Sequence, residues 1–241
     1  MDSSSHDNMS FLEHLEELRW HIIRSLIAIV SAGFICFLMK DFIFDTIIFG
    51  PKKMDFPTYK FLCQAATFIG VETTFCGDEF PFIVQNRTMA GQFSAHVMTS
   101  IISGFIISFP YILYEFWKFI SPGLLEKEKA KSRGFILISS LLFFIGVLFG
   151  YYIISPLSIN FLGTYQVSSQ VLNEIDLGSF ISLVRSSAIA SGIIFELPII
   201  IYFLTKAGVV TPESLVKYRK YALVLVLVLA AIITPPDVAS Q

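Results

Sequence analysis

Long apolar runs constrain this chain more than any other feature of its sequence. An α-helix needs about 20 apolar residues to cross about 30 Å of hydrocarbon. The sequence predicts five spans, at about residues 20–39, 93–116, 134–155, 179–204 and 221–233. We expect the third to end near Pro156, whose ring breaks helices. The fifth span is short, so it must thin the bilayer locally or pack against neighbouring helices.

Composition agrees with a membrane protein. Hydrophobic residues make up 54% of the 241 residues and charged residues 15%, whereas soluble domains have about 45–50% and about 25%. A net charge of −2 argues against a nucleic-acid partner, which needs a basic surface. The expected fold class is an all-α polytopic membrane protein, with residues 1–241 forming one transmembrane domain.

Basic residues are unequally divided between the two sides of these spans. One side carries Arg19, Arg24, Lys118, Lys127, Lys129, Lys131, Arg133, Lys206, Lys217, Arg219 and Lys220, and the other carries Lys40, Lys52, Lys53, Lys60 and Arg87. Cytoplasmic loops are the ones enriched in Lys and Arg, so the N-terminus is predicted to be cytoplasmic. The first ten residues have no cationic region typical of a cleaved signal peptide.

The three cysteines are too few for a disulfide scaffold. Cys63 and Cys76 lie in the long loop predicted on the outer side, where they could pair if that side is oxidising. Two free thiols are the equal alternative. Cys36 lies within the first span and is expected to be an apolar filler.

No motif of a known enzyme class occurs in the sequence. The four histidines show no metal-ligand spacing among themselves or with the cysteines. We therefore expect no catalytic residues, no metal and no cofactor.

An acidic helix is predicted at the N-terminus, where Ser10 and Glu13 form a capping box. Phe11, Leu15, Leu18 and Ile22 form an apolar stripe, and Glu13, Glu16, Glu17 and Trp20 lie on the opposite face. The simpler interpretation is a solvated face with a Glu16–Arg19 pair. The alternative is a surface that receives a cation, since most charge on this side is positive. Glu126 and Glu128 add carboxylates in the next cytoplasmic loop, where an alternating acid–base run is usually a solvated turn.

Glu196 lies in the middle of the fourth span, two residues before Pro198 and three turns after Arg185. An ionisable residue inside a span costs about 2.5–3.5 kcal/mol on insertion scales and is a functional-site hypothesis by default. The alternative is a protonated glutamate that hydrogen-bonds to a neighbouring helix.

With these residues the sequence resembles the TatC family of the twin-arginine translocase. The motifs that carry the resemblance are His14–Arg19, Pro110–Leu124 followed by Glu126–Lys129, Phe195–Pro198, Thr211–Glu213 and Thr234–Gln241. They occur in the family's order and on the expected membrane sides.

The resemblance implies a cupped helical bundle that receives signal peptides with paired arginines on folded cargo proteins. Glu17 and Glu128 would accept the two arginines, since a guanidinium forms a bidentate fork with a carboxylate. Arg19 and Phe119 would line the same surface. Glu196 would form a polar site facing the interior, and Pro51 and Asp237 would lie in outer-face loops.

The resemblance also implies partners and a location. The chain would act in the inner membrane, among its lipids, as part of a hetero-oligomer with TatA-like and TatB-like subunits and driven by the proton-motive force. The family has six spans, whereas this sequence stops at Gln241, where the sixth should begin, so we expect a truncated sequence. The first outer loop is also longer than the family's usual pattern.

Two other functions compete with this interpretation. A small-solute transporter or channel would place Glu196 and Arg185 along its path, and it predicts inverted repeats that are not visible. An intramembrane enzyme would need a nucleophile or a metal-binding set, and neither is found.

Overall fold

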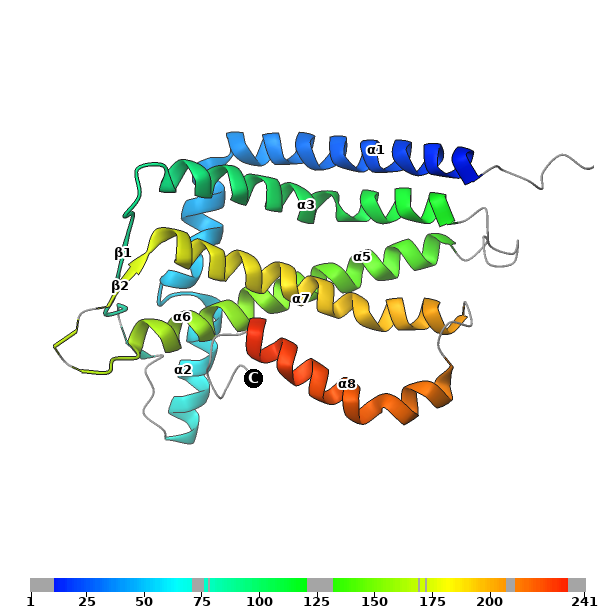
Figure 1. Ribbon diagram of the computed structural model, residues 1–241. Helices are drawn as coiled ribbons and strands as arrows, with labels where there is room; N and C mark the ends of the chain where they lie inside the picture. Colours follow the sequence, from blue (N-terminus) through cyan, green and yellow to red (C-terminus); the bar gives the residue numbers. More distant parts are fainter. Residues whose placement is uncertain are drawn as a thin grey trace, which may run out of the picture. The chain divides into compact units, whose positions relative to one another are not determined.

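The computed structural model describes residues 11–70, 76–77, 79–120, 132–168, 170–171, 173–206 and 211–233. The long helices are α1 (Phe11–Leu38), α3 (Gly91–Ile120), α5 (Ser132–Phe149), α7 (Leu177–Lys206) and α8 (Pro212–Ile233) (Figure 1). The shorter elements are η1 (Phe42–Ile48), η2 (Gly50–Lys52), α2 (Pro57–Ile69), β1 (Ile83–Gln85), η5 (Gly150–Ile154), α6 (Ser155–Thr164) and β2 (Glu174–Asp176). The chain divides into two compact units: residues 1–38 with 100–140, and residues 39–99 with 141–241.

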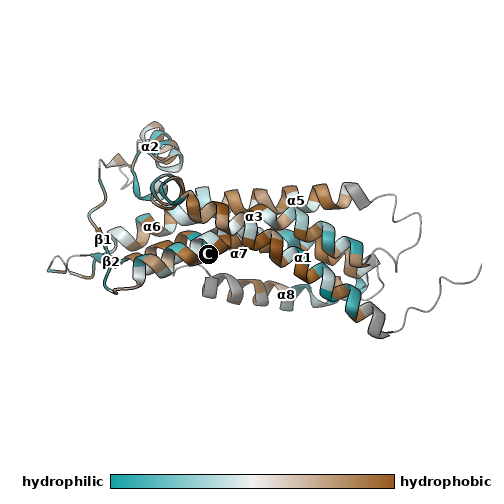
Figure 2. Cartoon of the chain, turned by 90° about the horizontal axis from the view of Figure 1, so that it is seen from above, coloured by the Kyte–Doolittle hydropathy of each residue, from teal (hydrophilic) through white to brown (hydrophobic). Residues whose placement is uncertain are grey.

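Four helical stretches of the described chain are long and apolar enough to cross a membrane. They are Leu15–Leu38, Gly91–Ile120, Gly134–Thr164 and Leu177–Thr205, and hydrophobic residues dominate them in Figure 2. Each covers one of the first four predicted spans almost completely. Helix α8 includes the predicted fifth span at residues 221–233 but begins earlier, at Pro212. That α8 crosses the membrane stays a prediction.

The helix break expected at Pro156 is wrong, whereas the end of the third span stays a prediction. The chain stays helical through the π-helical η5 and through α6 as far as Thr164. Proline has no N–H to bond the carbonyl four residues earlier, which here belongs to Tyr152. The hydroxyl of Thr58 donates a hydrogen bond to this carbonyl instead. Pro156 itself lies in the first turn of α6, where the ring is tolerated, so the helix continues.

In the first unit, α1 and α3 lie side by side (Figure 1) because small residues let their backbones approach closely. A Cβ atom added to Gly104 would lie 2.5 Å from the backbone nitrogen of Gly33. Four residues further along α3, the hydroxyl of Ser108 donates to the carbonyl oxygen of Ala28 over 2.9 Å. The first unit also contains part of α5, where the rings of Trp117 and Phe135 pack 4.7 Å apart.

In the second unit, α7 packs tightly against the end of α5 and against η5. A Cβ atom added to Gly146 would lie 2.7 Å from the carbonyl oxygen of Ser191, and one added to Gly192 would lie 2.8 Å from the ring of Phe143. Phe143 is fully buried. Larger side chains at these glycines would force the helices apart, so glycine sets the spacing here.

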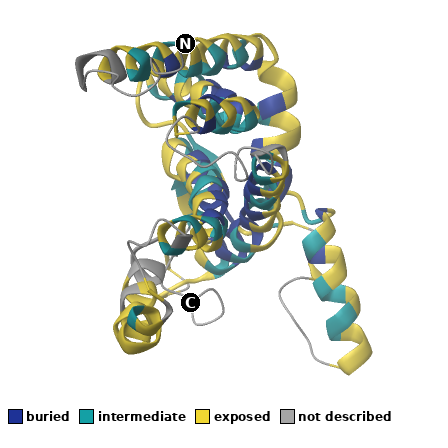
Figure 3. Cartoon of the chain, turned by 90° about the vertical axis from the view of Figure 1, so that its right-hand side faces the viewer, coloured by how far each residue is buried: buried dark blue, intermediate teal, exposed yellow. Residues whose placement is uncertain are grey.

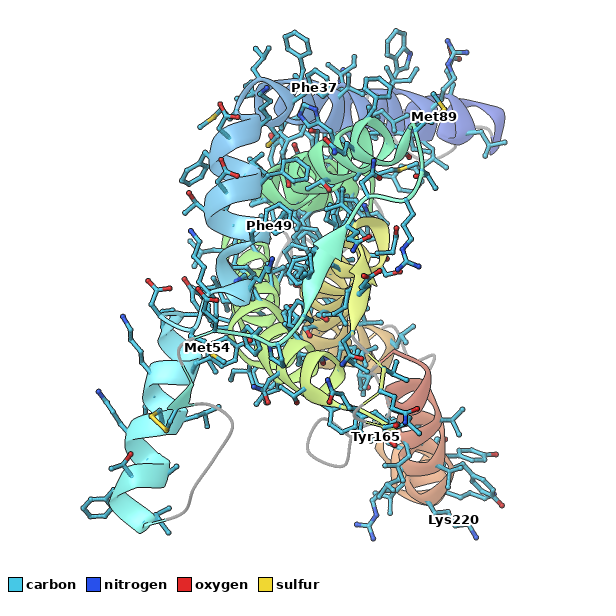
Figure 4. The ribbon with its side chains drawn as sticks, turned by 90° about the vertical axis from the view of Figure 1, so that its left-hand side faces the viewer. Phe37, Phe49, Met54, Met89, Tyr165 and Lys220 are labelled. Carbon is cyan, nitrogen blue, oxygen red and sulfur yellow. A yellow bond between two sulfur atoms is a disulfide. The ribbon has the colours of Figure 1, made fainter. Side chains whose placement is uncertain are left out.

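The segments between the spans have a defined structure in the second unit. Strands β1 and β2 pair in parallel with Ile83 opposite Glu174, and Arg87 forms an ion pair of 2.9 Å with Glu174. Phe49, which follows η1, stacks on Phe180 of α7 with ring centroids 5.7 Å apart (Figure 4). A disulfide joins Cys63 of α2 to Cys76. Together these contacts tie the long segment after α1 to α7.

Many large apolar side chains on the helices are exposed, as Figure 3 shows in yellow. Leu15 and Ile22, members of the apolar stripe predicted on the first helix, are both exposed. Lipid tails are as apolar as a leucine side chain, so an apolar face has no need to pack against protein in a membrane. The side of α1 that packs on α3 carries small residues such as Gly33 and Ala28 together with the polar His21.

Candidate functional site

A buried polar contact in the first unit joins His21 of α1 to Glu115 of α3. The Nδ1 atom of His21 donates to Oε2 of Glu115 over 2.6 Å. His21 is 8% exposed and Glu115 is 3% exposed. A buried carboxylate requires compensating partners, and this contact supplies one of them across the two helices.

Two further side chains complete the surroundings of this pair. Nη1 of Arg24, one turn after His21, lies 3.8 Å from the same Oε2 atom of Glu115. Phe119, one turn after Glu115 on α3, presents its ring to that of His21 at a centroid distance of 6.2 Å and an interplanar angle of 64°. The arrangement gives Glu115 two basic neighbours and packs an aromatic ring beside the imidazole.

Glu17 lies one helical turn before His21 on the same face of α1, since residues four apart are neighbours on a helix. Its side chain is half-buried. The Oε2 atom of Glu17 is buried and accepts no hydrogen bond from any described residue. A buried carboxylate oxygen without a donor costs about 1–3 kcal/mol or more, so this atom is poised to accept an N–H group.

The residues predicted for the binding surface differ in their surroundings. Phe119 lies in the cluster with His21, and Glu17 adjoins it on α1. Arg19 is exposed and its guanidinium carbon lies 5.7 Å from the ring centroid of Trp20, away from the face that carries Glu17 and His21. Glu128 lies outside the described residues.

The sequence by itself does not identify His21, Arg24 and Glu115 as members of the site. In the sequence His21 is one of four histidines without metal-ligand spacing, and Glu115 is part of the Pro110–Leu124 motif. The available signal was helical spacing, since Glu17, His21 and Arg24 recur at intervals of four and three residues and so share one face. Nothing in the sequence indicates that Glu115, on another helix, faces these three residues.

The predicted polar site at Glu196 lies in the second unit. Glu196 is buried, with 7% exposure, within α7 and near the kink-prone Pro198. Phe195, its neighbour in sequence, contacts the ring of Phe149 at a centroid distance of 5.5 Å. Arg185 is half-buried on the same helix.

Of the two residues predicted in outer-face loops, Pro51 is described and Asp237 lies outside the described residues. Pro51 is buried in η2, and its carbonyl oxygen accepts a hydrogen bond of 2.9 Å from the hydroxyl of Tyr59. The same hydroxyl lies 2.9 Å from the carbonyl oxygen of Pro156. Pro51 thus belongs to a buried junction of η2, α2 and α6 rather than to an open loop surface.

The described part of the chain contains no group of three or more His, Cys, Asp or Glu side chains that could hold a metal ion. The site on the first unit is instead an array of carboxylates and basic groups beside aromatic rings. Such an array suits recognition of cationic side chains by charge-assisted hydrogen bonds.

Fold and site together define a multi-pass helical membrane protein with a charged surface at one end of its first two spans. Residues 13–241 match the protein family described as Sec-independent protein translocase protein (TatC). The chain belongs to the TatC family and is a subunit of the twin-arginine translocase.

Relatives of known identity support this assignment. The chain is 46% identical over 235 residues to a TatC protein of Blattabacterium sp. subsp. Periplaneta americana, covering 97% of this chain and 88% of the relative. It is 37% identical over 236 residues to TatC of Aquifex aeolicus, covering 97% of this chain and 87% of the relative.

Solved structures agree with the relatives. A crystal structure of the twin-arginine translocase receptor TatC in DDM has a TM-score of 0.73 at 36% identity, covering 95% of this chain and 91% of that one. A second crystal structure of this receptor has a TM-score of 0.70 at 33% identity, with coverage of 95% and 90%. The family is a component of a protein translocase, so the small-solute transporter is not favoured.

Proposed function

We propose that this chain is the receptor that binds the paired arginines of twin-arginine signal peptides at the cytoplasmic face of the inner membrane. Glu17 and Glu128 accept the two guanidinium groups, and Phe119 lines the same surface. Arg19, which the sequence predicts for this surface, lies on another face of α1, beside Trp20. The solved relatives are themselves titled twin-arginine translocase receptors. TatA-like and TatB-like subunits complete the complex.

The observation that carries this proposal is the buried Oε2 atom of Glu17, which lacks a donor among the described residues. A guanidinium offers two N–H groups in a planar fork that matches a carboxylate, whereas an ammonium does not. Partial burial strengthens such a contact because water competes less for the charges. The site therefore favours arginine over lysine in the peptide.

The charge distribution supports the orientation. The first unit includes the end of α3 with Lys118, and the N-terminal half of α8 carries Lys217, Arg219 and Lys220. Lys220 and Lys217 lie over the rings of Tyr221 and Tyr218 at 5.2 and 5.9 Å; Figure 4 labels Lys220, on α8. Basic residues with adjacent tyrosines are typical of the cytoplasmic membrane interface.

The remaining predicted residues act away from this surface. Buried Glu196 serves a transport step after peptide binding, and Pro51 and Asp237 support the outer face. Arg87 and Glu174 join β1 to β2 on that face. The Cys63–Cys76 disulfide suits an oxidising compartment there.

The test is binding of a fluorescent twin-arginine peptide to the purified chain in detergent. Glu17→Gln keeps the shape of the side chain but removes its charge, so we expect about tenfold or greater loss of affinity from the lost charge-assisted hydrogen bonds. Glu128→Gln is expected to act similarly.

Glu16→Gln is the matched control, since Glu16 is the exposed neighbour of Glu17 on the same helix. It should leave affinity within about twofold, as expected for an exposed charge. Equal affinity of the wild type for the twin-arginine peptide and its twin-lysine version would contradict the proposal.

A further inference from the structure

Two carboxylates lie near His21, and each is a candidate to form a hydrogen bond with its imidazole ring. Glu17 precedes it by one turn on α1, and Glu115 faces it from α3. An acid followed by a base four residues later is the favoured orientation for an ion pair on a helix. In the structure, however, Nδ1 of His21 is bonded to Glu115 over 2.6 Å, and Glu17 keeps a buried oxygen without a donor among the described residues.

Three contacts hold His21 in place. Its Nδ1 atom is occupied by Glu115, its ring lies against that of Phe119, and its backbone carbonyl accepts the hydroxyl of Ser25 over 2.9 Å. Arg24 approaches Glu115 from the far side of His21, two turns beyond Glu17. Arg24 is therefore poorly placed to neutralise Glu17, whereas a rotated His21 is well placed to do so.

We propose that Glu115 is a positioning residue for peptide binding: it holds His21 away from Glu17 and so keeps the Glu17 carboxylate for an arginine of the signal peptide. The proposal rests on the proposed function, since it assumes that Glu17 is an arginine acceptor. Without Glu115, His21 turns to Glu17 and competes with the peptide for the same carboxylate.

The titratable and charged groups around His21 are Glu17 and Arg24 from α1, and Glu115 and Tyr111 from α3. The described part of α5 in this unit whose side chains are placed, residues 134–140, carries no titratable group. Among these groups, Glu17 is therefore the carboxylate left for His21 when Glu115 is removed.

The experiment compares the wild type with two variants of the full chain for binding of the twin-arginine peptide. Glu115→Gln should weaken binding about three- to tenfold, the size of one charge-assisted contact. The double variant Glu115→Gln with His21→Gln should recover wild-type affinity, because the competitor is gone.

Two further variants separate positioning from packing. The pair Glu115→Leu with His21→Leu replaces the buried polar contact by apolar side chains, a change that proteins often tolerate well, and it should also bind the peptide. Ser108→Ala removes another hydrogen bond between α1 and α3, to Ala28, without touching the charges, so any loss of affinity that it causes should not be rescued by adding His21→Gln.

The proposal is overturned if both double variants bind as weakly as Glu115→Gln, or if Glu115→Gln binds the peptide as tightly as the wild type. The proposed function fails separately, if Glu17→Gln in the wild-type background leaves arginine-dependent binding unchanged. The Glu17→Gln variant thus tests the proposed function, and the recovery of affinity in the double variants tests the role of Glu115.

Discussion

Single buried hydroxyl and carboxyl groups hold this molecule together at a few points. Tyr59 is fully buried, and its hydroxyl contacts the carbonyl oxygens of Pro51 and Pro156 at 2.9 Å each. Burial raises the pKa of Tyr59, so the hydroxyl keeps its proton and can donate. One side chain thereby joins three short elements of the second unit.

At the residue scale we predict that Tyr59→Phe destabilises the chain by about 1–2 kcal/mol, since two buried carbonyls lose a donor. Thermal unfolding in detergent measures this. Because the folded-state pKa lies above the unfolded one, Tyr59 contributes stability that is present below about pH 10 and lost above it. In the Tyr59→Phe variant the free energy of unfolding should therefore also fall less at alkaline pH. Tyr165→Phe, at an exposed tyrosine, is the control and should leave the melting temperature unchanged.

Helix pairs in this chain depend on glycine more than on large apolar side chains. Apolar burial offers little advantage to helices that already lie among lipid tails, so close backbone contact and interhelical hydrogen bonds decide the packing. Gly104 against Gly33 and Ser108 against Ala28 do this for α1 and α3. The same contacts align Glu115 with His21.

At the element scale we predict that Gly104→Ala separates α1 from α3, because its Cβ atom would lie 2.5 Å from a backbone nitrogen. The expected cost is about 1–3 kcal/mol, as for other overpacked sites, together with weaker peptide binding. Gly134→Ala is the matched control, with no atom within 4 Å of the added Cβ. It should be neutral or slightly stabilising. An unchanged melting temperature in Gly104→Ala would disprove the close packing.

For the molecule as a whole, the orientation of the spans decides which side of the membrane each loop faces. The proposed orientation places Glu16 in the cytoplasm and Met89 outside, where Met89 is fully exposed in the structure. Charge asymmetry of the loops is the physical basis.

At this scale we predict that Met89→Cys reacts with a membrane-impermeant maleimide on intact cells, whereas Glu16→Cys reacts only after the inner membrane is permeabilised. Cys36 is buried and Cys63 is bonded to Cys76, so the background is low. Labelling of both variants in intact cells would reject the orientation.

The sequence alone determined the class of this protein and most of its spans. A helix that crosses a lipid bilayer needs a long run of apolar residues, and such a run can be recognised in the sequence without a structure. Its motifs also identified the family, and they predict Glu17 as an arginine acceptor. The tertiary structure decided what depends on a second helix. It paired His21 with Glu115, and it kept the chain helical past Pro156 because Thr58, distant in sequence, bonds the carbonyl that proline leaves free. Such partners come from segments about 94 residues apart, a separation that local periodicity does not encode.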